Sequence, residues 1–283
     1  MSGQHLLDAA REPASPAQLT LDAALLTRPR LRVRDVVANL GHFSLVSYAV
    51  DPARVRPHVH ERFEFELIEG ADGHPKALVS MVPFEDQDFH FVGLPWLTFQ
   101  FGQTNYRTYV IDRETGQRAV WFFGTSLDSW SVAIPRHFWK LPWHKGRIRF
   151  DCEFDPAAKK YARYAMTTRS DWAPVKLALE DTGQPVTKLD GFADLETAWV
   201  ILTHPLVGVF HRRDSGLGTY HIWHDRLHCT TGRVLSARIG LFDRLGIVPF
   251  AEQTRPHSVL IQPQTEFTIY LPPGRYADVG RNR

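Results

Sequence analysis

Runs in which apolar and polar side chains alternate recur along this chain, and they constrain its fold more than any other feature. From Arg147 to Phe154 the even positions are apolar and the odd positions are charged. Successive side chains of a strand point to opposite faces. The register predicts exposed Arg147, Arg149 and Glu153, and buried Ile148, Phe150, Cys152 and Phe154. Extended backward, unless Gly146 forms a bulge, it places His144 on the apolar face and Lys145 on the polar face.

Similar runs predict strands over 42–50, 63–68, 77–84, 106–112, 118–124, 161–168, 218–223, 232–238 and 258–262. The runs 63–68 and 77–84 flank a turn at 71–75 and indicate a hairpin. Short helices are expected within 19–26, 129–139 and 192–202, and after Asp51, an N-cap with Pro52 at the first helical position. The sequence therefore predicts an α+β, β-rich fold with few short helices.

Composition bounds the class of protein. The 283 residues carry 33 basic and 31 acidic side chains, a balance that argues against nucleic-acid or membrane binding through bulk charge. No signal peptide and no stretch of 18 apolar residues is visible. The two cysteines, Cys152 and Cys229, do not form a secreted disulfide framework and are expected to be free. The cytoplasm is the expected location. We expect a peripheral segment at 1–30, a single domain at 31–272 and a tail at 273–283.

The segment from Ile134 to Lys145 contains the most informative motif. Arg136 and His137 are followed, after four residues, by Pro142, Trp143 and His144. This resembles the active-site segment of acetoacetate decarboxylases, where an Arg-Glu pair precedes Pro-Lys-Lys at the same spacing and one lysine forms a Schiff base with the substrate. In this alignment His137 takes the glutamate position, and Trp143 and His144 take the lysine positions. The resemblance implies that the chain has the decarboxylase scaffold but lacks the lysine that acts as its nucleophile.

A wider resemblance extends over roughly residues 40 to 270. Its motifs are Asp72-Gly73, Val82-Pro83-Phe84, Gly93-Leu94-Pro95, 105–110, 122–128 and 136–142. Together they resemble the uncharacterised bacterial YqjF-like family of the acetoacetate decarboxylase-like superfamily. Tyr106, Trp143 and Pro135 depart from the family pattern. The resemblance implies a bent, largely antiparallel, barrel-like sheet around an internal pocket.

Arg107 is the first candidate binding residue. One face of its expected strand carries Asn105, Arg107 and Tyr109. In the decarboxylases the corresponding strand supplies a pocket glutamate, so the resemblance implies a reversed charge. A guanidinium in an apolar cavity suits a carboxylate or phosphate, and Arg136 and Trp143 are the other candidates for contact with the ligand. The alternative for Arg107 is a structural Arg–Asp pair.

Histidines are the candidates for acid–base chemistry. His144 and His137 could transfer protons without a lysine, because imidazole titrates near neutral pH. The alternatives are a core histidine bonded to the backbone for His144 and a solvated or capping side chain for His137. Lys140 and Lys145 are weak candidates for a nucleophile. The cluster of His221, His224 and His228 lacks metal-ligand spacing if it lies on a strand, so neither a metal nor a cofactor is expected.

Two functions remain open on the sequence. The first is an uncharacterised protein with an internal pocket for a small organic anion, a carboxylate, which lacks the Schiff-base lysine. The alternative is an enzyme of lyase or hydrolase type that uses histidine acid–base chemistry and arginine anion binding. The sequence does not decide whether the protein is an enzyme, and it is compatible with a homo-oligomer.

Overall fold

Strands make up most of this molecule. The computed structural model describes residues 18–130 and 133–276, and within them 14 strands form one continuous sheet. The expectation of a β-rich fold with few short helices is therefore confirmed.

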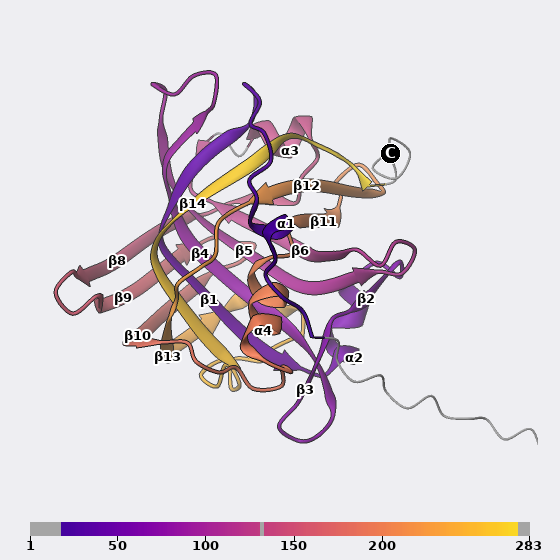
Figure 1. The fold of residues 1–283 in the computed structure, drawn as a ribbon, viewed down its shortest axis with the longest axis vertical. Helices are drawn as coiled ribbons and strands as arrows, with labels where there is room; N and C mark the ends of the chain where they lie inside the picture. Colours follow the sequence, from indigo (N-terminus) through magenta and orange to yellow (C-terminus); the bar gives the residue numbers. More distant parts are fainter. Residues whose placement is uncertain (1–17, 131–132, 277–283) are drawn as a thin grey trace, which may run out of the picture.

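Part of the sheet closes into a ring, drawn in Figure 1. Each strand pairs with the next in the order β1, β4, β5, β6, β11, β12 and β14, and β14 also pairs with β1. Only β6 and β11 are parallel neighbours within the ring. These strands are β1 (Val36–Val50), β4 (Pro75–Phe91), β5 (Phe99–Asp112), β6 (Arg118–Leu127), β11 (Val207–His211), β12 (Leu217–Trp223) and β14 (Ser258–Arg275). The bent, largely antiparallel sheet expected from the resemblance is present.

The sheet continues beyond the ring as an arm. The arm runs from β14 through β13 (Thr230–Ile239), β10 (Val175–Pro185) and β9 (Lys160–Arg169) to β8 (Arg147–Asp155). Apolar side chains of the arm and the outer face of the ring form one core, which includes Tyr106, Ile148 and Leu177. A second core inside the ring includes Leu45, Tyr109 and Leu202. The two faces of the ring strands therefore serve two different cores.

Short elements complete the fold. The strands β2 (Phe63–Phe65), β3 (Leu67–Glu69) and β7 (Trp143–Lys145) pair with β5, β4 and β6. The helices are α1 (Ala23–Leu26), α2 (Pro52–Val55), η1 (Arg56–His58, a 3₁₀ turn), α3 (Ala133–Phe138), α4 (Leu195–Thr203) and α5 (Gly240–Arg244). Asp51 caps α2 and Asp194 caps α4 through their carboxylates. The predicted cap at Asp51 is confirmed.

The predicted register of β8 assigns the exposed charged residues correctly, but most of its apolar side chains are less buried than predicted. Arg147, Arg149 and Glu153 are exposed, whereas Ile148 is buried. Phe150 and Cys152 are only half-buried, and Phe154 is 37% exposed. The prediction of a fully buried row was wrong because β8 is the last strand of the arm, and because its pairing with β9 shifts register between Glu153 and Phe154, so the alternation does not extend to Phe154.

The predicted hairpin of 63–68 with 77–84 was also wrong in part. The first run divides into β2, which pairs with β5, and β3, which pairs with β4. The division falls at Glu66, which binds Arg118 across the sheet at 2.8 Å. The strands β10 and β11 and the helix α5 were not predicted. Cys152 and Cys229 are free.

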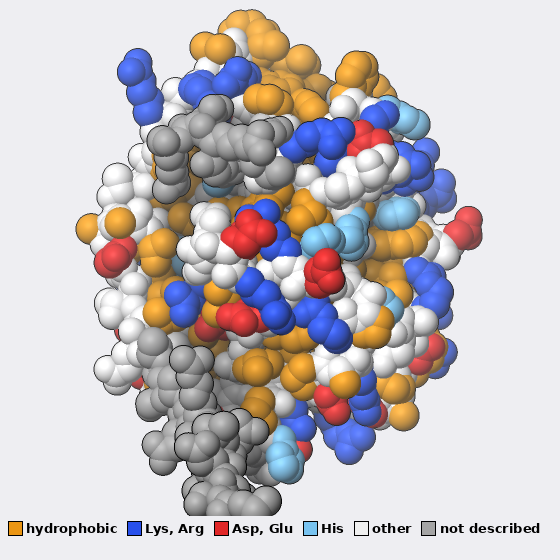
Figure 2. Space-filling model, turned by 90° about the vertical axis from the view of Figure 1, so that its right-hand side faces the viewer, with side chains coloured by type: hydrophobic (Ala, Val, Ile, Leu, Met, Phe, Trp, Pro, Cys, Tyr) orange, Lys and Arg blue, Asp and Glu red, His pale blue; other side chains and the backbone are white. Residues whose placement is uncertain are grey.

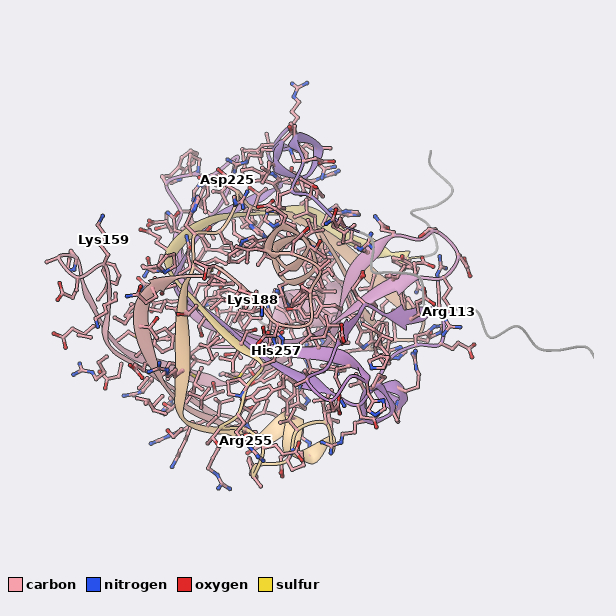
Figure 3. All side chains as sticks on the ribbon, turned by 60° about the horizontal axis from the view of Figure 1, so that its bottom comes forward. Arg113, Lys159, Lys188, Asp225, Arg255 and His257 are labelled. Carbon is pink, nitrogen blue, oxygen red and sulfur yellow. The ribbon has the colours of Figure 1, made fainter. Side chains whose placement is uncertain are left out.

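Figure 2 shows acidic and basic side chains interspersed on one face, and in Figure 3 the exposed Arg113, Lys159 and Arg255 project from different sides of the molecule. Among the described residues, no helix is long and apolar enough to cross a membrane. The domain boundaries stay a prediction; Leu21 packs in the inner core, and β14 reaches Arg275.

Candidate functional site

A cavity lies inside the ring, bordered by β1, β4, β5, β6, β7, β12 and β14. It offers about 80 Å³ to the centres of water molecules, where a single water needs roughly 10–15 Å³. It therefore has room for a small organic molecule. Much of the wall is aromatic, from Phe43, Phe84, Phe122, Trp139, Trp143 and Phe267.

The pairing of β4 with β5 decides which side chains face this cavity. The register is unbroken from Val79 opposite Thr108 to Asp86 opposite Phe101. Directly opposed residues point to the same face of a sheet. The inward-facing pairs, from one end to the other, are Ser80 with Arg107, Val82 with Asn105, Phe84 with Gln103, and Asp86 with Phe101.

Arg107 is buried at one end of this row. It is 8% exposed, and its Nη2 donates to the carbonyl of Leu202 at 2.9 Å. Its guanidinium carbon lies 5.5 Å from the ring centre of Tyr109. Its Nε has no hydrogen-bond partner, and no carboxylate of the described residues pairs with it. The Arg–Asp brace considered as the alternative is thus not formed within the described chain. The carbonyls at the C-terminal end of α4, the negative end of the helix dipole, partly compensate the charge.

Asn105 presents a polar group beside Arg107. Its Oδ1 accepts hydrogen bonds from Thr125 Oγ1 at 2.8 Å and from Gln103 Nε2 at 3.0 Å. These two donors fix the amide orientation, and the Asn105 nitrogen has no further partner among the described contacts. A ligand oxygen near Arg107 could therefore accept from Asn105 as well.

Tyr220 lies on the wall contributed by β12. Its ring stacks on Phe122 with 5.5 Å between centres. Gly208 permits this stack, since a Cβ there would lie 2.7 Å from Phe122 Cε2 and 3.0 Å from Tyr220 Cζ. Burial raises the pKa of the Tyr220 phenol and Arg107 opposes this rise, so the hydroxyl stays protonated and can donate.

Asp86 occupies the other end of the row, and the sequence reasoning missed it. It is 2% exposed, and its Oδ2 has no hydrogen-bond partner. Burial raises the pKa of this carboxyl well above its usual range, and the charge of Glu85 adds to the rise. The signal was available in the sequence, because Val82, Phe84 and Asp86 alternate along one face of the strand.

Trp143 and His144, adjacent residues of the decarboxylase-like motif, lie on opposite faces of the ring. Trp143 lines the cavity, whereas the His144 ring stacks on Trp172 on the outer face of the ring, with 3.9 Å between centres. Burial and, secondly, Arg136 lower the pKa of His144 to about 4. The expectation that Arg107, Arg136 and His144 border one pocket was wrong for His144, because it follows Trp143 on β7 and adjacent residues of a strand point to opposite faces.

The remaining sequence-predicted residues lie in different surroundings. Arg136 donates from Nη1 to the carbonyl of Trp143 at 2.5 Å and is not part of the described cavity wall. Tyr109 hydrogen-bonds Ser80 Oγ at 2.9 Å. His137 is exposed on α3, so its catalytic role stays a prediction. Lys145 is exposed, as the register predicted, and no lysine of the described residues lines the cavity.

Two buried histidines lie beside the Arg107 end. The rings of His204 and His224 are 4.5 Å apart. His224 Nε2 contacts the carbonyl of Thr203 at 2.7 Å, on the same helix end that binds Arg107. Burial and the neighbouring His224 lower the pKa of His204 to about 3. No group of three or more His, Cys, Asp or Glu in the described part of the chain is arranged to hold a metal ion.

Comparison with known proteins agrees with this architecture. A family model described as "Uncharacterized conserved protein", DUF2071, matches residues 38–266. No curated protein matches the chain.

Solved structures share the fold. An acetoacetate decarboxylase from Legionella pneumophila has 14% identity and a TM-score of 0.52, covering 92% of this chain and 97% of that one. An acetoacetate decarboxylase-like enzyme from Sphingomonas wittichii RW1 has 12% identity and a TM-score of 0.56, covering 87% and 94%. The enduracididine biosynthesis enzyme MppR, complexed with pyruvate, has 14% identity and a TM-score of 0.50, covering 90% and 95%. The chain therefore has an acetoacetate decarboxylase-like fold.

Proposed function

The chain belongs to the DUF2071 family, whose description assigns no activity, and we propose that it binds a small organic carboxylate in the ring cavity. The observation that carries the proposal is Arg107, a buried arginine on the wall of an apolar cavity without a carboxylate partner in the described chain. A buried charge that lacks an ionic partner costs several kcal/mol. An anionic ligand would remove much of that cost.

The donors around Arg107 suit the geometry of a carboxylate. The planar guanidinium can offer two parallel N–H groups to two oxygens, and its Nε is unpaired. Asn105 on the same strand and Tyr220 on β12 add neutral donors to the cavity wall. The surrounding aromatic wall favours an organic anion over a hydrated inorganic one, since burial of apolar ligand surface adds to affinity.

We also propose that no Schiff base forms between a lysine and a ligand in this cavity. The lysine positions of the decarboxylase motif hold Trp143 and His144, and Trp143 fills part of the wall. Binding to pyruvate is a property of the MppR complex, and it makes short keto acids reasonable first probes here. We propose a cytoplasmic protein that does not act on nucleic acids.

A histidine-based enzyme is the weaker candidate. No histidine of the described residues lines the cavity, and His144 lies on the opposite face of the sheet. If the protein is an enzyme, Asp86 is a carboxyl group positioned to reach a ligand.

Calorimetric titration with a panel of small carboxylates, among them pyruvate and acetoacetate, tests the proposal. Arg107→Ala should weaken a ligand by about 1.5–3 kcal/mol, the usual contribution of charge-assisted hydrogen bonds, which is roughly ten- to 150-fold in Kd. Arg54→Gln is the matched control, since Arg54 forms only an exposed ion pair with Glu252. Equal weakening by both substitutions, or no binding of any carboxylate, would contradict the proposal. Borohydride trapping followed by intact mass should show no adduct.

A further inference from the structure

The cavity has a second polar end, formed by Asp86 of β4. This carboxyl is 2% exposed, lines the cavity and leaves Oδ2 without a hydrogen-bond partner. No lysine, arginine or histidine of the described chain pairs with it. A buried polar atom without a partner is rare in folded proteins and calls for an explanation, and a ligand atom would supply one.

Asp86 and Arg107 lie far apart on the same wall. Arg107 is opposite Ser80, so the two positions are six residues apart along β4. At about 3.3 Å per residue this corresponds to about 20 Å between backbone positions. Two hydrogen bonds of about 2.9 Å take up part of that span. A single extended molecule of small cross-section could therefore contact both ends.

The wall between the two ends is mostly apolar. Val82 and Phe84 lie on β4 between them, opposite Asn105 and Gln103. Gln103 already donates to Asn105. The middle of the cavity thus favours methylene groups or a ring, whereas the two ends favour polar atoms.

The state of Asp86 decides which group it would bind. An ionised carboxylate would be left unpaired in an apolar cavity beside Glu85, which is unfavourable. Burial raises the pKa of Asp86 well above its usual range, first by desolvation and then through Glu85. The neutral carboxyl has an O–H group, which donates to an oxygen acceptor.

Resting on the proposed function, we infer that the ligand is an unbranched ω-oxygenated carboxylic acid. Its carboxylate binds Arg107, its chain lies along Val82 and Phe84, and its distal hydroxyl or carbonyl oxygen accepts a hydrogen bond from Asp86. The distal oxygen determines specificity, because a ligand without it leaves the Asp86 donor unpaired in the cavity.

Calorimetry on the full chain with matched acids tests the inference. The probes are butanoate, hexanoate and octanoate, their ω-hydroxy counterparts and 6-aminohexanoate. At the best chain length the hydroxy acid should bind about tenfold more tightly than the plain acid, the usual effect of one buried hydrogen bond. Asp86→Asn, which keeps a neutral donor, should retain most of this preference. Asp86→Leu should abolish it.

Each other outcome has a definite meaning. If plain and hydroxy acids bind equally well and both depend on Arg107, the inference is wrong and the proposed function stands. A preference that survives in Asp86→Leu also overturns the inference. Tightest binding of 6-aminohexanoate would show an ionised Asp86 that pairs with ammonium, which overturns it as well. If none of the acids binds, both the inference and the proposed function fail. The preference of the wild-type protein decides the case even if a variant does not fold.

Discussion

Replacing Arg107 with methionine separates a ligand-binding role from a structural one. The change keeps much of the side-chain length and removes the charge. In the folded protein Arg107 makes one hydrogen bond to Leu202 and one contact with the Tyr109 ring. If Arg107 exists for binding, its removal should cost the protein little stability.

The magnitude follows from these contacts. The charge-assisted hydrogen bond contributes about 1.5–3 kcal/mol, and the cation–π contact about 0.5–2 kcal/mol. Against this stands the desolvation of a guanidinium that is 8% exposed and has an unpaired Nε, a cost of several kcal/mol. The opposing contributions nearly cancel. We therefore expect Arg107→Met to change the free energy of unfolding by less than about 1.5 kcal/mol in either direction, or roughly 3–6 °C in Tm.

Urea denaturation followed by circular dichroism measures this change without ligand, and calorimetry on the same sample measures carboxylate binding. Near-native stability together with lost binding supports the ligand-binding role. A loss of 3–5 kcal/mol, the usual result of breaking a buried ion pair, would refute the reasoning and show that Arg107 braces the ring.

Three further predictions concern stability. Folding holds the pKa of His144 at about 4, below its ordinary value of 6.5. Between pH 6.5 and pH 4 the unfolded chain therefore binds more protons than the folded one. The free energy of unfolding should fall as the pH drops through this window. His144→Phe should flatten that part of a pH series of urea denaturations, and an unchanged slope would count against the assignment. Gln253→Leu should lower the free energy of unfolding by about 2–5 kcal/mol, since the buried amide makes three hydrogen bonds to the backbone of Ile239 and Val248. A loss below about 1 kcal/mol in chemical denaturation would show that water replaces these hydrogen bonds. Asp112→Asn should lower the free energy of unfolding by about 2–4 kcal/mol, because the carboxylate accepts a hydrogen bond from Arg62 at 2.8 Å. Thermal unfolding measures the change in stability, and an unshifted Tm would contradict the prediction.

Local patterns in the sequence predicted local structure well. The alternation around Ile148 gave the correct faces of β8 because side-chain direction depends only on the period of the strand. Asp51 and Pro52 predicted a helix start because capping involves neighbouring residues. The same alternation, applied to Val175, Leu177 and Leu179, would have predicted β10.

Pairings between distant segments were beyond the sequence alone. Trp143 and His144 are adjacent in the motif, yet they belong to the inner and outer faces of the ring. The α4 carbonyl that holds Arg107 belongs to Leu202, 95 residues away. Single-sequence periodicity contains no information on such contacts, so the candidate residues could be named but their convergence could not.

The closure of the ring by β14 determines when the ring cavity can exist. Val36 of β1 pairs with Ile269 of β14, and Ile269 and Phe267 also line the cavity. During synthesis, the inner face of the earlier strands has no closing wall until β14 has left the ribosome. Pairings of such high contact order also form slowly. The wall of the cavity therefore stays incomplete until β14 is added, and the proposed ligand site exists only when the strand order is complete.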